Sequence, residues 1–367
     1  MTQPANGPEL IARREGAVGR ITLNRPKALN ALTLGMVEAM SVALDAFEAD
    51  GSVRSVIIDG AGERGLCAGG DIRALYDSRN EGPALAEAFW TREYRLNLRI
   101  AEFPKDVVTF MDGIVMGGGV GISAHARHRI VTETTAFAMP ETAIGFIPDV
   151  GATWLLPHAP GEVGIYLALT GERIGAADAI YAGVADAFVP KGALPALAAD
   201  LAAGADGAAE AIRRHARDPE PAQLAARRAE IDRLFAGDDM EAIMARLAEA
   251  ESDFARKTLE ALAQKSPTSL KVTLAAQRRG RALPSLAACL DMEYRVVLRF
   301  FASAELHEGI RAAVVNKDRK PLWNPASLED VTDEMVADFF APLGDGELGL
   351  AGAEGGERNA DKGRKAQ

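Results

Sequence analysis

The feature of this chain that most constrains its fold is a pair of glycine-rich segments, each at the point where a predicted strand gives way to a predicted helix. One is Ala68-Gly69-Gly70-Asp71 and the other is Gly117-Gly118-Gly119. Glycine lets a backbone N–H approach a ligand closely, because no Cβ stands in the way. A helix N-terminus adds unpaired N–H groups and a positive dipole end. A single Gly-Gly pair usually marks only a tight turn, but two such turns favour a paired hydrogen-bonding hole for a developing oxyanion.

The order of predicted elements around these turns is typical of an α/β fold. Helical spacing of apolar residues predicts a helix over 33–49, for which Thr33 is a suitable N-cap. Strands are expected at 17–24, 53–59, 106–110, 114–116 and 128–132, and further helices at 84–103 and 119–127. Strands that alternate with helices predict an α/β fold.

The composition changes near residue 190. Residues 191–264 are rich in Ala, Glu, Asp and Arg and poor in β-branched residues, which predicts helices. Helices are also expected at 267–279 and 283–303. We therefore predict a core over 8–190, a helical region over 191–340 and a disordered tail over 344–367, which is mostly glycine, alanine and charged residues.

Composition and charge exclude several classes of protein. The net charge of −11 argues against a nucleic-acid partner, because phosphate binding needs clustered Lys and Arg. No apolar run reaches the roughly 18–20 residues of a membrane span, and the N-terminus lacks the apolar region of a secretory signal. Only Cys67 and Cys289 are present, so no disulfide framework is expected. These observations predict a cytoplasmic protein without a membrane partner.

The candidate chemical groups are carboxylates rather than metal ligands. Glu141 and Asp149 lie eight residues apart in an otherwise apolar segment, and either one has a simpler interpretation as a turn residue. Glu93 lies in a predicted helix, where a solvated charge is the ordinary interpretation. The five histidines form no metal-ligand pattern, so no metal is expected.

The second glycine turn has an alternative interpretation as a dinucleotide-binding loop. Gly117–Gly121 follows a predicted strand, and Glu141 comes about 20 residues later. A dinucleotide fingerprint normally belongs to the first βαβ unit of a domain. A glycine-rich loop alone is a weak signal, so we discount a nucleotide cofactor.

Five segments, in their order and spacing, resemble the crotonase (enoyl-CoA hydratase/isomerase) superfamily over about residues 10 to 330. They are NRPKALNAL (24–32), GLCAGGDIRAL (65–75), GIVMGGGVGIS (113–123), PETAIGFIPDVG (140–151) and LALTGERIGAADAIYAGVADAFV (167–189). Within the superfamily, the chain is most similar to hydrolases of 3-hydroxyisobutyryl-CoA. The resemblance implies a crotonase-like ββα superhelix core, with the C-terminal helices completing the pocket.

The resemblance also implies roles for individual residues. The backbone N–H groups of Gly70 and Gly118 would form an oxyanion hole, and Glu141 would be the catalytic carboxylate. Asp149 would lie near the 3-hydroxyl of the substrate, and Glu93 would line the acyl pocket. Coenzyme A would contact the loops that contribute Lys27, Leu29, Ala68, Gly69 and Asp71. Coenzyme A is then part of the substrate, and no separate cofactor is expected.

Two departures from the superfamily pattern separate the candidate reactions. The superfamily pattern for hydratases has two glutamates, and the resemblance would place the first of them at Gly121, which has no side chain. Asp149 stands where many relatives have glycine. The pattern therefore favours thioester hydrolysis of a short-chain 3-hydroxyacyl-CoA, either 3-hydroxyisobutyryl-CoA or 3-hydroxypropionyl-CoA, in valine catabolism. An enoyl-CoA hydratase/isomerase and a non-catalytic acyl-CoA-binding protein are the alternatives. Relatives commonly form trimers, so a homo-oligomer is a further expectation.

Overall fold

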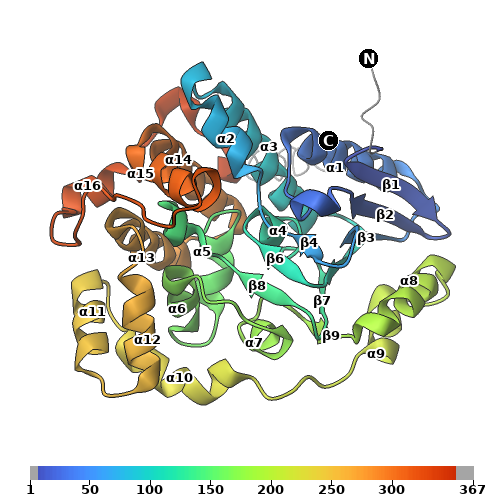
Figure 1. The fold of residues 1–367 in the computed structure, drawn as a ribbon. Coiled ribbons are helices and arrows are strands. Elements are labelled where there is room, and N and C mark those ends of the chain that lie inside the picture. The colour runs from blue at the N-terminus through green and yellow to red at the C-terminus, as the bar shows by residue number, and fades with distance from the viewer. Residues whose placement is uncertain (1–6, 353–367) are drawn as a thin grey trace, which may run out of the picture.

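Two β-sheets form the centre of the molecule in the computed structural model, which describes residues 7–352 apart from the side chains of Asn80 and Glu81 (Figure 1). The larger sheet has the order β1-β2-β3-β5-β7-β9, in which only β1 runs antiparallel to its neighbour. Its strands are β1 (Leu10–Glu15), β2 (Val18–Leu23), β3 (Ser55–Gly60), β5 (Asp106–Met111), β7 (His128–Val131) and β9 (Ala187–Phe188). The smaller, parallel sheet contains β4 (Gly65–Cys67), β6 (Ile114–Met116) and β8 (Ala136–Ala138).

A repeated unit of two strands and a helical turn links the two sheets. Three consecutive strand pairs, β3–β4, β5–β6 and β7–β8, each contribute one strand to either sheet. The helical turns that follow are α2 (Ile72–Asp77), α4 (Gly118–Gly121) and the 3₁₀ turn η3 (Glu141–Ile144). Because β4, β6 and β8 are parallel, their carboxyl ends meet at one edge. Both glycine turns and Glu141 therefore reach the same edge of the small sheet.

The predicted helices are present, with one difference in length. Helix α1 (Leu34–Ala49) is capped by Thr33, whose hydroxyl accepts a hydrogen bond from the Met36 N–H at 3.2 Å. Helix α3 (Ala84–Ala101) matches the prediction for 84–103. The helix predicted over 119–127 is wrong in extent, since α4 ends at Gly121. Glycine is a poor helix former, and the Ser123 hydroxyl bonds back to the Gly119 carbonyl at 2.6 Å.

Helices fill most of the chain after β8. They are α5 (Ala152–Leu155), α6 (Val163–Thr170), α7 (Ala176–Tyr181), α8 (Leu194–Ala203), α9 (Ala208–His215), α10 (Gln223–Leu234), α11 (Met240–Glu249), α12 (Asp253–Leu262), α13 (Pro267–Ala282), α14 (Leu286–Ala302), α15 (Ala304–Ile310) and α16 (Asp333–Asp338). The α/β fold with a C-terminal helical region is thus confirmed. One apolar cluster includes Ile21 of β2 and Phe300 of α14, so it spans residue 190, and the division into domains at that residue stays a prediction.

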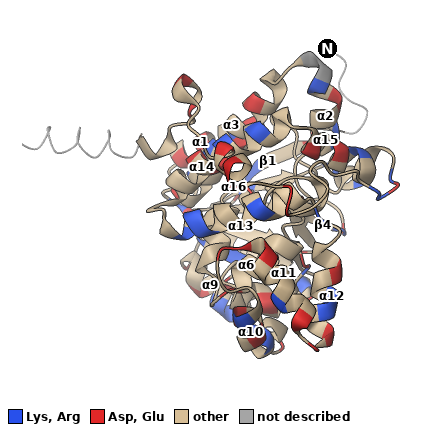
Figure 2. Cartoon of the chain, turned by 90° about the vertical axis from the view of Figure 1, so that its left-hand side faces the viewer, with Lys and Arg blue, Asp and Glu red and all other residues tan. Residues whose placement is uncertain are grey.

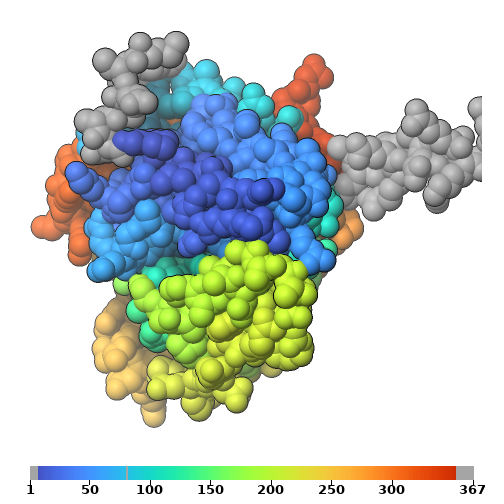
Figure 3. Space-filling model, turned by 90° about the vertical axis from the view of Figure 1, so that its right-hand side faces the viewer, coloured from blue at the N-terminus to red at the C-terminus, as the bar shows by residue number. Residues whose placement is uncertain are grey.

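Helices α8 and α9 pack on the large sheet, away from the rest of the helical region. Leu197 and Leu201 of α8 belong to a second apolar cluster with Val18 and Val108 of the sheet. Figure 3 shows α8 and α9 in yellow-green next to the blue N-terminal strands. This cluster covers part of the large sheet, whereas α13, α14 and α15 lie near the small sheet and its loops (Figure 1).

The prediction of a disordered tail from residue 344 is wrong for residues 344–352. Leu348 and Leu350 are buried in the main apolar cluster. The N–H groups of Leu350 and Ala351 donate hydrogen bonds to the Asp291 carboxylate at 2.8 and 2.9 Å. These apolar and polar anchors were not recognised among the surrounding glycines and charges. Residues 353–367 of the predicted tail lie outside the described residues.

Candidate active site

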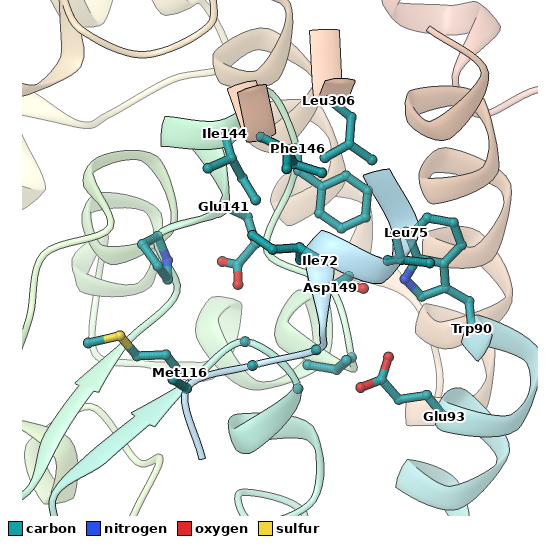
Figure 4. Close-up of a pocket in the computed structure, with 18 of the residues that line it drawn as sticks. Ile72, Leu75, Trp90, Glu93, Met116, Glu141, Ile144, Phe146, Asp149 and Leu306 are labelled. Carbon is teal, nitrogen blue, oxygen red and sulfur yellow. The ribbon is translucent and has the colours of Figure 1, made fainter. Parts of the chain in front are cut away.

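A pocket of about 220 Å³ lies at the edge of the small sheet where β4, β6 and β8 end. Its lining combines both glycine turns with the acids Glu93, Glu141 and Asp149 and with a wall of apolar side chains. Figure 4 shows Glu141 entering from one side and Glu93 from the other. Segments that lie between Ala68 and Ile310 in the sequence are thereby brought together around one small volume.

The two glycine turns are in direct contact with each other. A Cβ built on Gly118 would lie 3.3 Å from the Gly70 amide nitrogen and 2.5 Å from Oε1 of Glu93. Gly118 is the first residue of α4, so its N–H lies in the unpaired first turn. The Gly70 N–H donates to no described protein atom. Two free amides therefore lie close to each other at the pocket, and there is no space for a side chain at residue 118.

The three acids come from three different elements, and all are buried. Glu141 opens η3 and is 7% exposed, Glu93 on α3 is 2% exposed, and Asp149 in the loop before α5 is 4% exposed. One carboxylate oxygen each of Glu93 and Glu141 has no hydrogen-bond partner among the described residues. Buried oxygens without partners cost free energy, which is typical of groups that interact with a bound ligand.

Burial raises the pKa of all three carboxyl groups, and the acids reinforce one another. Desolvation raises the pKa of Glu93 and Glu141 well above the usual range, and the nearby Asp149 raises both further. Burial raises the pKa of Asp149 to about 7, although the hydrogen bond from the Tyr94 hydroxyl opposes the shift. The half-buried Lys265 lowers the pKa of Glu141 slightly by its charge. Burial and mutual repulsion thus make these carboxyl groups take up protons more readily than carboxyl groups in water do.

The raised pKa of Asp149 predicts a pH-dependent stability. Between pH 3.8 and about 7 the folded protein keeps a proton that the unfolded chain has lost, so stability falls as pH rises through this window. Asp149→Asn removes the contribution of this ionisation to the free energy of unfolding. The gain in unfolding free energy of the variant over wild type should be small at pH 4 and grow to a few kcal/mol at pH 8, at about 1.4 kcal/mol per pH unit or less. Urea unfolding of both proteins at several pH values measures it.

The control for this measurement is Asp218→Asn, because Asp218 is exposed and has no ion pair or hydrogen bond with any residue that the structure describes. We expect that variant to follow the wild-type curve. A wild-type pH dependence retained in Asp149→Asn would show that Asp149 ionises as freely in the folded protein as in the unfolded chain.

Aromatic and aliphatic side chains close the other side of the pocket. Trp90 of α3 stacks on Phe146 with 5.7 Å between ring centroids and meets Phe301 of α14 edge-on. Leu306 and Ile310 of α15 also line the pocket, so the C-terminal helices contribute to it. A volume this small and apolar suits a short acyl chain.

The structure brings most, but not all, of the predicted site residues to the pocket. Ala68 and Gly69 line it together with the residues described above. Lys27, Leu29 and Asp71 do not line it. Asp71 caps α2 and pairs with Arg25 at 3.0 Å, and Leu29 accepts a hydrogen bond from the Ala68 N–H. Contacts of these three residues with coenzyme A stay a prediction.

Two buried residues behind the pocket were missed by the sequence reasoning. The Tyr94 hydroxyl donates to Oδ2 of Asp149 at 2.7 Å. Glu293 of α14 accepts hydrogen bonds from the turn that follows Asp149. The available signal for Glu293 was a carboxylate within the largely apolar segment 286–302. Tyr94 gave no signal apart from its place next to Glu93.

Other classes of site find no support in residues 7–352. These residues contain no group of three or more His, Cys, Asp or Glu placed to hold a metal ion. Their helices include none with an apolar stretch of the length that a bilayer crossing requires. On the side of the molecule shown in Figure 2, basic and acidic residues are interspersed over the helices without an extended basic stripe.

Known proteins resemble this chain over nearly its whole length. A family model described as enoyl-CoA hydratase/isomerase matches residues 18–340. A protein of Xenopus tropicalis named 3-hydroxyisobutyryl-CoA hydrolase, mitochondrial, is 42% identical over 351 residues, which cover 93% of this chain and 91% of that protein. The human protein of the same name is 38% identical, with 93% and 90% covered.

Two solved structures share both sequence and fold with it. A crystal structure titled as a carnitinyl-CoA dehydratase from Mycobacterium thermoresistibile is 47% identical with a TM-score of 0.89, covering 93% of this chain and 98% of its own. One titled as an enoyl-CoA hydratase from Rhodobacter sphaeroides is 44% identical with a TM-score of 0.87, covering 93% and 99%. These matches confirm the crotonase-like fold. The chain belongs to the enoyl-CoA hydratase/isomerase (crotonase) family.

Proposed function

We propose that this protein hydrolyses the thioester of a short-chain 3-hydroxyacyl-CoA to the free acid and coenzyme A. The observation that carries the proposal is the meeting of the two glycine turns and Glu141 in one pocket. The curated relatives named 3-hydroxyisobutyryl-CoA hydrolase support the same reaction. We take 3-hydroxyisobutyryl-CoA as the first candidate substrate and 3-hydroxypropionyl-CoA as the second.

The chemistry needs an oxyanion hole and a group that acts on water or on the thioester. The N–H groups of Gly70 and Gly118 would hold the thioester oxygen as it becomes negative. Glu141 would either attack the carbonyl carbon, giving a mixed anhydride that water then cleaves, or remove a proton from the attacking water. In both routes the C–S bond breaks and the coenzyme A thiolate takes up a proton. No separate cofactor is needed.

Asp149 would select for the 3-hydroxyl group of the substrate by accepting its hydrogen bond. A buried carboxylate left without this partner is unfavourable, so analogues that lack the hydroxyl should react more slowly. Glu93, which reaches the same pocket from α3, would line the acyl site. This assignment gives each of the three buried acids a separate task.

A hydratase activity is the second candidate, because the titles of two similar solved structures name a hydratase and a dehydratase. The surroundings of Gly121, where a hydratase-like first glutamate would fall, argue against it. A Cβ at residue 121 would lie 2.7 Å from the Val150 Cβ and 2.8 Å from Nδ2 of Asn97. The space for a second glutamate is therefore filled, and only Glu141 remains of the pair.

The experiment that separates these functions follows two products from each substrate. With 3-hydroxyisobutyryl-CoA we expect release of free thiol, and with crotonyl-CoA we expect no loss of enoyl absorbance. Loss of enoyl absorbance without thiol release would establish the hydratase instead. Tight binding of acyl-CoA with neither product would indicate a non-catalytic binding protein.

Pathway, location and assembly go beyond this chemistry. A role in valine catabolism is part of our proposal, since it follows from the candidate substrate. The vertebrate relatives are named as mitochondrial, and that word describes those proteins. A cytoplasmic location and a homo-oligomer stay predictions from the sequence.

A further inference from the structure

The turn that carries Asp149 is held by a buried carboxylate from a distant part of the chain. Oε2 of Glu293 accepts the Gly151 N–H at 2.7 Å, and Oε1 accepts the Thr153 N–H at 2.9 Å and the Thr153 hydroxyl at 2.6 Å. Glu293 is fully buried on α14, 140 residues further along the chain than Thr153. Burial raises the pKa of the Glu293 carboxyl to about 8, and these three hydrogen bonds oppose that rise. The turn is thus fixed from outside its own segment.

The backbone of this turn adopts conformations that need such support. Val150 has φ +53°, an outlier for a β-branched residue, and Gly151 has φ +86°. A Cβ on Gly151 would lie 2.5 Å from Nε2 of His125, whose ring bonds the Val150 carbonyl at 2.7 Å. Strained backbone persists where surrounding contacts determine it, and it is often found at functional sites.

A second hydrogen bond holds the Asp149 side chain itself. The Tyr94 hydroxyl donates to Oδ2 at 2.7 Å, and Tyr94 is fully buried on α3. Its ring meets that of Tyr294 edge-on, with 6.3 Å between centroids. Tyr294 directly follows Glu293 on α14, and its hydroxyl bonds Thr91 of α3 at 2.9 Å. Helices α3 and α14 are therefore joined to each other, and α3 contacts Asp149 itself while α14 contacts the turn that follows it.

We propose that Glu293 and Tyr94 are positioning residues that fix Asp149 for recognition of the substrate's 3-hydroxyl. Neither residue lines the pocket, so both act through Asp149. The inference rests on the proposed function, because it assigns to Asp149 the hydrogen bond from the substrate hydroxyl. It extends that function by assigning the selectivity for the 3-hydroxyl group to the contacts between α3, α14 and the 149–153 turn.

The test compares two substrates that differ only in the hydroxyl, 3-hydroxyisobutyryl-CoA and isobutyryl-CoA. The measured quantity is the ratio of their kcat/KM values from thiol release. Glu293→Gln places an amide N–H₂ against the donors of the turn, and Tyr94→Phe removes one oxygen. We expect the ratio to fall about tenfold or more in each variant, mainly through loss with the hydroxylated substrate.

The pH profile adds a readout that a merely structural role would not move. The Tyr94 hydrogen bond favours the ionised Asp149, so Tyr94→Phe should raise the pKa of Asp149. The selectivity ratio should then recover at a higher pH than in wild type. Val297→Ala is the control, because Val297 is buried on α14 one turn beyond Glu293. It should lower stability and keep the ratio and its pH profile.

The outcomes distinguish this inference from the proposed function. Absence of 3-hydroxyisobutyryl-CoA hydrolysis by the wild-type enzyme would reject the proposed function itself. A selective wild-type enzyme with an unchanged ratio in Tyr94→Phe and in Glu293→Gln would overturn only the positioning role. If Glu293→Gln fails to fold, Tyr94→Phe, which differs by one oxygen atom, decides the question.

Discussion

Glu141→Gln is expected to lower kcat for thioester hydrolysis by about 10²–10⁴-fold, the range that general-base catalysis contributes, and by more if Glu141 is the nucleophile. The substitution keeps the shape of the side chain but removes both the negative charge and the capacity to accept a proton. Glu141 lies in the pocket with no partner for one oxygen, so the loss should not come from broken internal contacts. Thiol release under saturating substrate measures kcat.

The control for Glu141→Gln is Glu87→Gln, an exposed glutamate in the first turn of α3. It should leave kcat and KM unchanged. Turnover by Glu141→Gln at the wild-type rate would remove Glu141 from the mechanism.

If wild-type enzyme turns over in heavy-oxygen water and the label enters the Glu141 carboxylate, the nucleophilic route applies. An unlabelled Glu141 is expected both for general-base catalysis and for a nucleophilic route in which water attacks the substrate-derived carbonyl of the mixed anhydride.

Gly118→Ala is expected to lower kcat by about 10²–10³-fold, the loss seen when one oxyanion-hole donor is removed. The new Cβ would lie 2.5 Å from Oε1 of Glu93, 3.1 Å from Cδ1 of Leu32 and 3.3 Å from the Gly70 amide nitrogen. Real Cβ atoms essentially never come within 3.0 Å of another heavy atom, so the Glu93 carboxylate must be displaced, and the 3.3 Å contact requires the Gly118 and Gly70 amides to separate by a few tenths of an ångström. The transition state then loses a donor, while much of the ground-state binding surface remains.

Two further glycines make the Gly118 prediction specific. A Cβ on Gly70 would meet only the ring edge of Phe89 at 3.2 and 3.3 Å, so Gly70→Ala should have a much smaller effect. A Cβ on Gly192 would meet nothing within 4 Å, and Gly192→Ala should behave as wild type. Equal losses in the Gly118 and Gly70 variants would contradict the steric explanation, and no loss in either would argue against the oxyanion hole.

Local sequence signals predicted much of the framework. The helical spacing of apolar residues and the N-cap Thr33 predicted α1. Short apolar runs in the sequence predicted the buried strands β3 and β5. Strand β1 was missed because it is an edge strand with exposed charges, including Arg13 and Arg14, and edges carry polar residues. The extent of α4 was overestimated because glycine-rich turns interrupt the helix after a single turn.

The candidate site shows the same division between local and long-range information. The glycine turns and Glu141 were identifiable because the backbone freedom of glycine and an acid in apolar surroundings are local features. Tyr94 and Glu293 were not, because their function depends on contacts 55 residues or more away in sequence. The apolar wall from α3, α14 and α15 likewise arises only from packing. The catalytic roles themselves stay predictions.

The most direct test of this account is a crystal structure of Glu141→Gln with bound 3-hydroxyisobutyryl-CoA. We predict that the thioester oxygen lies within about 3 Å of both the Gly70 and Gly118 nitrogens, with the residue 141 side chain facing the carbonyl carbon. A thioester oxygen bound away from either amide, or a carbonyl carbon out of reach of residue 141, would contradict it.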